Sequence, residues 1–201
     1  MKNPIRRSRK IGKTQGGRVQ DGKASEKWSR IFTEDIWMRL SESNLKWQIL
    51  KENPSRDYYH PCQGDEYIEV LKQLPRKETD GLRAIVLRRT PKFDLKLGIE
   101  AQQRYYCVIL NSFPKSNTYS TKKKQSQSII KHYKNWCSNW EQTETGWNFK
   151  WKVEEVRRYY LYYLFLHELG HLNQPYYYTR KRAEDFAHNY ALEWARKLNQ
   201  L

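Results

Sequence analysis

Two histidines and a glutamate in the last fifth of the sequence have a spacing that suits metal chemistry. His167, Glu168 and His171 form an HExxH pattern within the run LFLHELGHL at residues 164–172. On a helix, residues four apart lie on the same face, so both imidazoles can reach one metal ion. Neutral imidazole is a good zinc ligand, and Glu168 would project beside the metal, where it can take a proton from a water molecule. The pattern therefore predicts a Zn²⁺ site with Glu168 as the catalytic base of a hydrolase.

The residues around this pattern favour the metal site over two ordinary histidines on a helix. An aromatic and aliphatic run precedes the motif, and its interior is small and uncharged. Charged neighbours there would be costly in a buried active-site helix.

A zinc site of this type needs a third protein ligand and an open position for water. Residues 172–180 contain no Cys, His, Asp or Glu, so the search moves to the next expected helix. Glu184 is the first carboxylate there, and it is the preferred third ligand. Asp185 and His188 stay open as alternatives, and His188 also as a hydrogen-bonding partner of a ligand.

The helices and strands expected from the sequence, which would position the candidate ligands, predict an α+β domain. Apolar periodicity and breaker residues favour both helices and strands along the chain. The expected helices span residues 33–50, 65–74, 126–136, 153–171 and 181–198, and the expected strands span residues 82–89, 104–110 and 147–151. Seven tyrosines flank the motif, and one of them could stabilise an oxyanion, although the sequence does not single one out. They are Tyr159, Tyr160, Tyr162, Tyr163, Tyr176, Tyr177 and Tyr178.

The segment HELGH at residues 167–171, followed by AEDFA at residues 183–187, resembles the gluzincin side of the zincin-like metallopeptidases. It is most similar to small bacterial HELGH proteins that carry this second segment. The resemblance covers residues 146–190, and residues 82–113 more loosely. It implies a zincin-like fold, in which a small mixed or antiparallel sheet packs on the active-site helix, and zinc peptidase activity on peptides or proteins. In that fold an edge strand holds an extended substrate, and residues 147–151 are the candidate for it.

Two family patterns are not met. The longer gluzincin signature has Asp where this chain has His188, so the residues around the metal ligands differ from those of that family. The short metzincin form has glycine and histidine where this chain has Gln174 and Tyr177.

The net charge of +16 is concentrated in two segments. Residues 1–30 carry ten Lys or Arg against Asp21 and Glu26, and residues 111–134 carry six Lys and no acid. Residues 1–27 hold few apolar side chains, so they are expected to form a disordered basic tail before a domain over residues 28–201. Both basic segments are candidate nucleic-acid contacts. The alternative function is therefore a nucleic-acid-binding protein whose HExxH site is structural or vestigial, and the two functions are compatible.

Three cysteines with wide spacing, Cys62, Cys107 and Cys137, predict buried or free thiols in a reducing compartment. No apolar run approaches the length of a membrane helix, and the basic N-terminus lacks the apolar stretch of a secretory signal. The sequence therefore predicts a cytoplasmic protein with no membrane segment.

Overall fold

The computed structural model describes residues 46–104, 106–120 and 132–201. The chain divides into two units, Met1–Lys46 and Trp47–Leu201, and the second unit holds all but one of the described residues. The expected basic tail, the expected domain start at residue 28 and the helix start at Thr33 lie outside the described residues, as do four of the six lysines of residues 111–134. Within the second unit the architecture is mixed α and β, with small sheets and a C-terminal helix.

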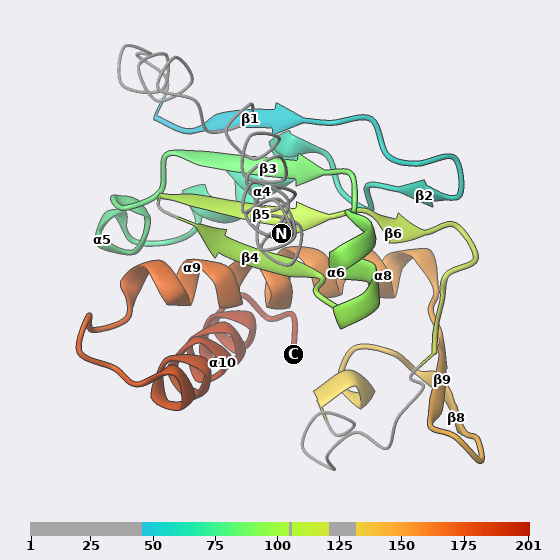
Figure 1. Ribbon diagram of the computed structural model, residues 1–201. Helices are drawn as coiled ribbons and strands as arrows, with labels where there is room; N and C mark the ends of the chain where they lie inside the picture. The colour runs from blue at the N-terminus through green and yellow to red at the C-terminus, as the bar shows by residue number, and fades with distance from the viewer. Residues whose placement is uncertain (1–45, 105, 121–131) are drawn as a thin grey trace, which may run out of the picture. The chain divides into compact units, whose positions relative to one another are not determined.

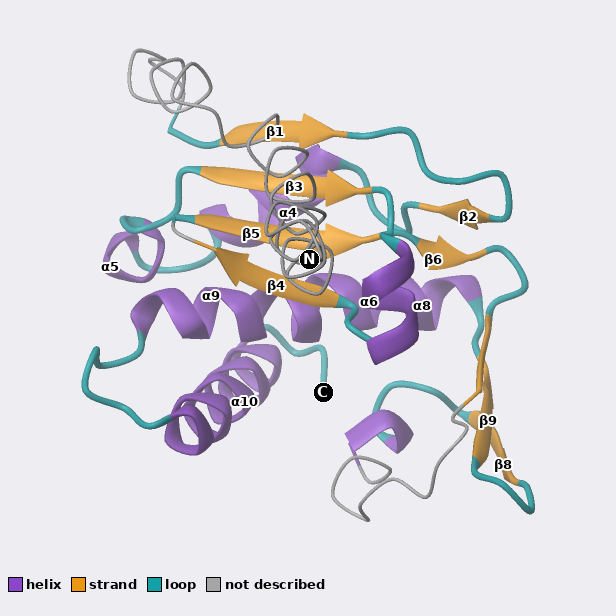
Figure 2. Ribbon diagram, viewed as in Figure 1, coloured by secondary structure: helices purple, strands orange, loops and turns teal. Residues whose placement is uncertain are grey.

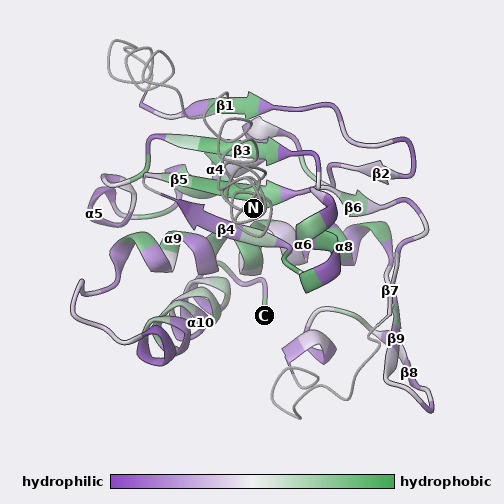
Figure 3. Cartoon of the chain, in the orientation of Figure 1, coloured by the Kyte–Doolittle hydropathy of each residue, from purple (hydrophilic) through white to green (hydrophobic). Residues whose placement is uncertain are grey.

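A four-stranded mixed sheet forms the core of this unit (Figure 1). Its order is β1 (Gln48–Lys51), β3 (Ala84–Arg88), β5 (Cys107–Asn111) and β4 (Ala101–Arg104). The first three strands are parallel, and β4 runs antiparallel to β5 at the edge. Every residue of β3 and β5 is buried, which fits their β-branched and aliphatic runs. Figure 3 shows the contrast between these apolar strands and the hydrophilic β4.

Two smaller sheets flank this core. One pairs β2 (Tyr58–Tyr59) with β6 (Phe113–Pro114), and the other has the order β7 (Thr118–Ser120), β9 (Trp147–Lys150) and β8 (Asn139–Gln142). The expected strand over residues 147–151 is confirmed as β9. However, β9 is the middle strand of its sheet, so both of its edges are already paired. Its expected role as a substrate-holding edge strand is therefore wrong.

The HExxH segment lies on a long helix that contains one π-helical turn. α8 (Val153–Tyr159), η1 (Tyr160–Leu164) and α9 (Phe165–Asn173) follow one another without a break, as expected for residues 153–171 (Figure 2). The Tyr160 hydroxyl in the π turn donates to the Asn111 carbonyl at the end of β5, at 2.9 Å. A π turn adds a residue to the helical repeat, so it changes the direction of the side chains around it.

Four further helices lie in the described unit, in addition to a short helical segment at residues 132–134. They are α4 (Gly64–Lys72), α5 (Arg76–Thr79), α6 (Lys92–Leu97) and α10 (Arg180–Lys197). α4 and α10 correspond to the helices expected over residues 65–74 and 181–198. α9 lies between β4 and α10 (Figure 1). No helix within the described residues is long and apolar enough to cross a membrane.

Two strands differ from the sequence-based expectation. The sequence predicts that the helix over residues 33–50 includes residues 48–50, but these residues lie in β1, which pairs with β3. Backbone pairing with a buried neighbour outweighs a weak helical periodicity over so short a segment. The sequence does not predict β4, because Ala-Gln-Gln-Arg has no β-branched or aromatic residue. Its pairing with β5 places it in the sheet. Of the helix expected over residues 126–136, only residues 132–134 are described as helical.

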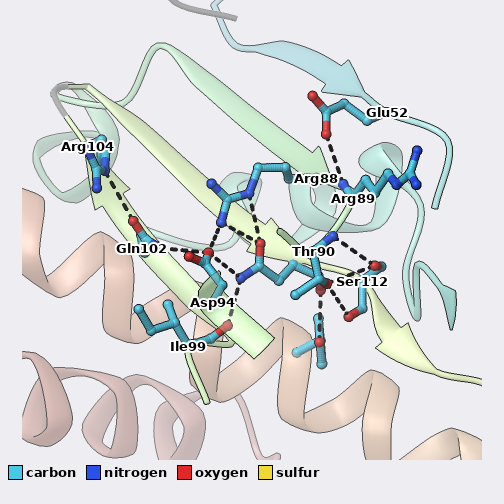
Figure 4. A network of polar contacts seen from close by, with 11 residues as sticks. Glu52, Arg88, Arg89, Thr90, Asp94, Ile99, Gln102, Arg104 and Ser112 are labelled. Atoms are coloured by element: carbon cyan, nitrogen blue, oxygen red, sulfur yellow. Dashed lines mark hydrogen bonds and ion pairs between the residues drawn. The ribbon is translucent and has the colours of Figure 1, made fainter. Parts of the chain in front are cut away.

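A buried polar network holds the chain where it enters β4 (Figure 4). Arg88 and Asp94 form an ion pair, with side chains only 3% and 6% exposed. The Asn111 amide donates to the Asp94 carboxylate at 3.0 Å and to the Ile99 carbonyl at 2.7 Å. The Gln102 amide donates to the same carboxylate at 2.9 Å. The network thus ties α6 to the first residues of β4, which fixes the position of that edge strand.

Candidate metal centre

Three predicted ligands, His167, His171 and Glu184, converge on one point. Nε2 of His171 lies 3.2 Å from Nε2 of His167. Glu184 Oε2 lies 3.5 Å from His167 Nε2 and 3.6 Å from His171 Nε2. This is the one group of at least three His, Cys, Asp or Glu side chains within the described ranges that is arranged to hold a metal ion. Both imidazole side chains are 14% exposed and the carboxylate is 56% exposed.

The spacing of these three atoms fits a tetrahedral zinc ion. Zinc–nitrogen and zinc–oxygen bonds of 2.0–2.2 Å at tetrahedral angles place neighbouring ligand atoms about 3.3 Å apart. The three separations lie close to that value. Two imidazoles and one carboxylate also match the donor set of catalytic zinc sites, which leave a fourth position for water or substrate. The residues present therefore fit the ion that the sequence predicted.

Close packing of α9 on α10 brings Glu184 to the two histidines. A Cβ atom on Gly170 would lie 2.9 Å from the Ala187 Cα, so only glycine permits this approach. Ala183 and Ala187 are buried in the same interface. Of the alternative ligands, Asp185 lines the cavity in front of the site but does not join the cluster. His188 also lies outside the cluster, and its Nδ1 contacts the Tyr163 hydroxyl instead.

The Glu168 carboxyl lies beside the two histidines but does not belong to the cluster of ligand atoms. Its side chain is buried. Burial raises the pKa of the Glu168 carboxyl, while the neighbouring histidines and a hydrogen bond with the Gln103 backbone oppose this shift. A raised pKa brings a carboxylate closer to the range in which it accepts and releases protons near neutral pH.

The two imidazoles differ in the hydrogen bonding of their Nδ1 atoms. Gln174 Oε1 lies 3.0 Å from His171 Nδ1, which leaves Nε2 of that ring for the metal. The Asn173 amide donates to the Leu169 carbonyl at 3.0 Å and to the Glu78 carbonyl at 2.9 Å, which anchors the end of α9. By contrast, His167 Nδ1 is buried without a hydrogen-bond partner among the described residues.

Tyr163, His188 and His132 form a second group next to His167, and of these three residues only His132 carries no prediction from the sequence. The Tyr163 hydroxyl lies 3.1 Å from His188 Nδ1, and its ring centroid lies 5.6 Å from that of His167. The His132 ring packs on Tyr163 with centroids 3.8 Å apart. Burial, together with the nearby His188 and His167, lowers the pKa of His132 to about 3, so this ring stays neutral. The π turn that carries Tyr163 has no recognisable sequence signal.

The other tyrosines near the motif have other roles in the structure. Tyr159 and Tyr160 are buried in the core, and Tyr176 and Tyr177 are exposed in the connection between α9 and α10. Tyr163 differs from them because its hydroxyl contacts His188 Nδ1 and its ring lies against His167.

A cavity of about 800 Å³ opens from the three ligands along β4. Its lining comes from residues 98–104, from the long helix, from α10 and from the short helical segment at residues 132–134. Gln102 pairs with Ile109 and the Glu100 carbonyl accepts from Asn111, so the even-numbered residues of β4 face β5. Backbone groups alternate along a strand, so those of Ala101 and Gln103 face the cavity. An edge strand thus borders the site, and it is β4.

Little of the predicted nucleic-acid surface is within the described residues. Lys115 and Lys134 are exposed, and the Lys134 ammonium lies 3.7 Å from the centroid of the Trp140 ring. The remaining lysines of that segment, Lys122, Lys123, Lys124 and Lys131, lie outside the described residues. Cys62, Cys107 and Cys137 are buried free thiols.

Comparisons of this chain with family models, with curated proteins and with solved structures find no match.

Proposed function

We propose that the chain is a zinc-dependent peptidase with a zincin-like arrangement of its active site. One observation carries the proposal. His167, His171 and Glu184 present their ligand atoms at tetrahedral spacing, with the Glu168 carboxyl beside them and the edge of β4 alongside. A buried carboxyl next to a metal triad is what a hydrolase needs to activate water. An edge strand next to it is what an extended peptide needs for binding.

The proposal assigns a residue to each step of peptide hydrolysis. His167, His171 and Glu184 would hold the zinc ion, which would supply Lewis acidity and lower the pKa of a bound water molecule. The Glu168 carboxylate takes a proton from the attacking water and delivers it to the nitrogen of the leaving amine. The Tyr163 hydroxyl, oriented by His188, donates to the carbonyl oxygen as negative charge develops there. The outward-facing backbone groups of Ala101 pair with the substrate backbone.

The test is the variant Glu168→Gln, compared with wild type in zinc content and in hydrolysis of a peptide library. The amide has nearly the same shape but cannot accept the proton, so zinc should stay at one per chain while hydrolysis falls at least about 10²-fold. A wild-type protein without zinc would overturn the proposal. A Glu168→Gln protein that loses its zinc would show that Glu168 is a ligand, and the role assigned to it would be wrong.

A further inference from the structure

The carboxyl of Glu100 occupies the same cavity as the ligands, at a distance from them along the cleft. Glu100 immediately precedes β4, three residues before Gln103, which contacts Glu168. Three residues of extended chain span about 10 Å. The long helix gives a similar distance, because Tyr159, which bonds to Glu100, lies eight residues and so about 12 Å before His167. Glu100 is thus within reach of a substrate side chain when the substrate backbone lies at the ligands.

Tyrosine hydroxyls hold only one of the two Glu100 carboxyl oxygens. Tyr159 donates to Oε2 at 2.8 Å and Tyr133 donates to the same atom at 2.9 Å. Among the described residues, Oε1 has no hydrogen-bond partner, and no Lys, Arg or His forms an ion pair with Glu100. The Glu100 carboxyl is half-buried, and withdrawing a carboxyl from water with no cationic partner among the described residues is costly, so its presence at this position needs an explanation.

The walls around this carboxyl are aromatic. The Tyr133 and Tyr159 ring centroids are 6.0 Å apart, and Tyr119 lies against Tyr133 at 5.8 Å. Gly98 adds no side chain, and a Cβ there would lie 2.9 Å from the Tyr119 hydroxyl. Because the Tyr133 and Tyr159 rings are buried, they position the carboxyl through their hydroxyls. A carboxylate held in this way binds an ammonium or guanidinium group through an ion pair.

We propose that Glu100, with Tyr133 and Tyr159, forms a subsite for a cationic side chain, so that the enzyme cleaves peptides next to or near lysine or arginine. The proposal rests on the peptidase function above and names its substrate class. Charges along the cavity agree with it, because Arg104 and Arg180 line the cavity from the other end of β4 and from the start of α10. Those arginines are placed to repel a cation, whereas the Glu100 end attracts one.

The ionisation of Glu100 is coupled to the binding of a cation. Burial raises the pKa of Glu100, and the two tyrosine hydroxyls only partly oppose this shift. An entering ammonium group favours the ionised carboxylate, whose Oε1 then accepts a charge-assisted hydrogen bond. A neutral side chain of the same length fills the space without that bond. The expected preference for a cationic over a neutral side chain is therefore about tenfold or more.

The substrate test needs no protein variant. A library of short peptides is incubated with the zinc-loaded protein, and the cleaved bonds are identified by mass spectrometry. Lysine or arginine should be enriched at one fixed position relative to the cleaved bond. Acetylating that lysine keeps its stem and removes its charge, so kcat/KM should fall about tenfold or more. Equal cleavage of the lysine and acetyl-lysine peptides would overturn the proposal.

Two matched variants then assign the preference to Glu100. In Glu100→Gln, the ratio of kcat/KM for lysine and acetyl-lysine peptides should fall toward one. Glu78→Gln is the control, because Glu78 also accepts a tyrosine hydroxyl, from Tyr190 at 3.0 Å, but lies outside this cavity. It should keep the wild-type ratio. A preference that survives in Glu100→Gln would place the cation elsewhere and overturn the assignment.

A binding measurement separates this proposal from the peptidase proposal. Butylammonium, a mimic of the lysine side chain, and butanol are compared as probes by ligand-observed NMR. Butylammonium should bind wild type and Glu78→Gln but not Glu100→Gln, and butanol should show no such difference. If no peptide is cleaved but this pattern holds, the peptidase proposal fails and the cation subsite stands. If butylammonium binds no better than butanol, Glu100 is only a structural carboxyl.

Discussion

Gly170 on α9 and Ala187 on α10 are so close that a Cβ atom on Gly170 would lie 2.9 Å from the Ala187 Cα. The contact lies between the two helices that carry the candidate ligands, with Gly170 next to His171 and Ala187 one turn after Glu184. The separation of the helices at this point therefore sets the distance between the carboxylate and the imidazoles.

Replacing Gly170 with alanine should push α10 away from α9. Overpacking of this kind costs about 1–3 kcal/mol of stability, and zinc affinity should fall because Glu184 retreats from the histidines. Gly81→Ala is the control, since a Cβ there meets no atom within 4 Å. Urea denaturation and a zinc competition titration measure the two effects. Normal zinc affinity in a stable Gly170→Ala protein would show that the helix contact does not position the ligand.

The third ligand can be tested by removing the two adjacent carboxylates separately. Glu184→Ala should lower zinc affinity by orders of magnitude, because two histidines and water alone hold zinc weakly. Asp185→Ala should retain zinc, since that side chain does not join the ligand cluster. Elemental analysis after dialysis distinguishes them. Loss of zinc in Asp185→Ala with retention in Glu184→Ala would reverse the assignment.

Tyr163→Phe should reduce kcat without releasing zinc. Removing one hydrogen-bond donor to a developing oxyanion costs about 10²–10³-fold in kcat, and KM should change little. The neighbour Tyr162 lies on the same π turn but does not line the cavity, so Tyr162→Phe should keep its activity. Steady-state kinetics on one cleaved peptide gives the comparison. A Tyr163→Phe enzyme with unchanged kcat would exclude the hydroxyl from the reaction.

Glu100 should make the folded protein less stable as the pH rises. Its pKa is raised in the folded state by burial, so the unfolded chain releases this proton first. The contribution to stability is therefore fully present below the unfolded pKa, about 4, and is lost as the pH rises through the folded pKa. The free energy of unfolding of wild type should fall relative to Glu100→Gln over that window. Tyr119, Tyr133 and Tyr159 face Glu100 and titrate far above this window.

Urea titrations at several pH values measure this difference between wild type and Glu100→Gln. Glu144→Gln changes an exposed carboxylate and should show no such pH dependence. The difference in free energy of unfolding between wild type and Glu100→Gln could instead stay constant with pH, or wild type could become relatively more stable as the pH rises. Either result would mean that folding does not raise the pKa of Glu100.

Asp94→Ala should be strongly destabilising. It removes one partner of the buried Arg88–Asp94 pair and leaves the guanidinium without its carboxylate, at a cost of about 3–5 kcal/mol. Asp80→Ala breaks the exposed pair with Arg76, which is worth less than about 1 kcal/mol. Thermal or urea unfolding of both variants checks the contrast. Similar small losses in both would show that the network does not hold β4.

The sequence by itself determined the part of the site that depends on one helix. The spacing of His167 and His171 places both rings on one face, and Glu168 must then lie beside them, because helical geometry depends only on local hydrogen bonds. Buried strands were similarly visible as short apolar runs, as in β3 and β5. Each of these helices and strands can be recognised from the types and spacing of its own residues.

Only the tertiary structure decided which groups from other elements meet this helix. Glu184, Asp185 and His188 were all open as ligands until the packing at Gly170 gave α10 its position. β4 has no strand pattern of its own, and it exists because β5 and the Asp94 network hold it. Glu100 and Tyr163 acquire their positions from that strand and from the π turn. Such contacts join residues that are distant in the sequence, so no local pattern records them.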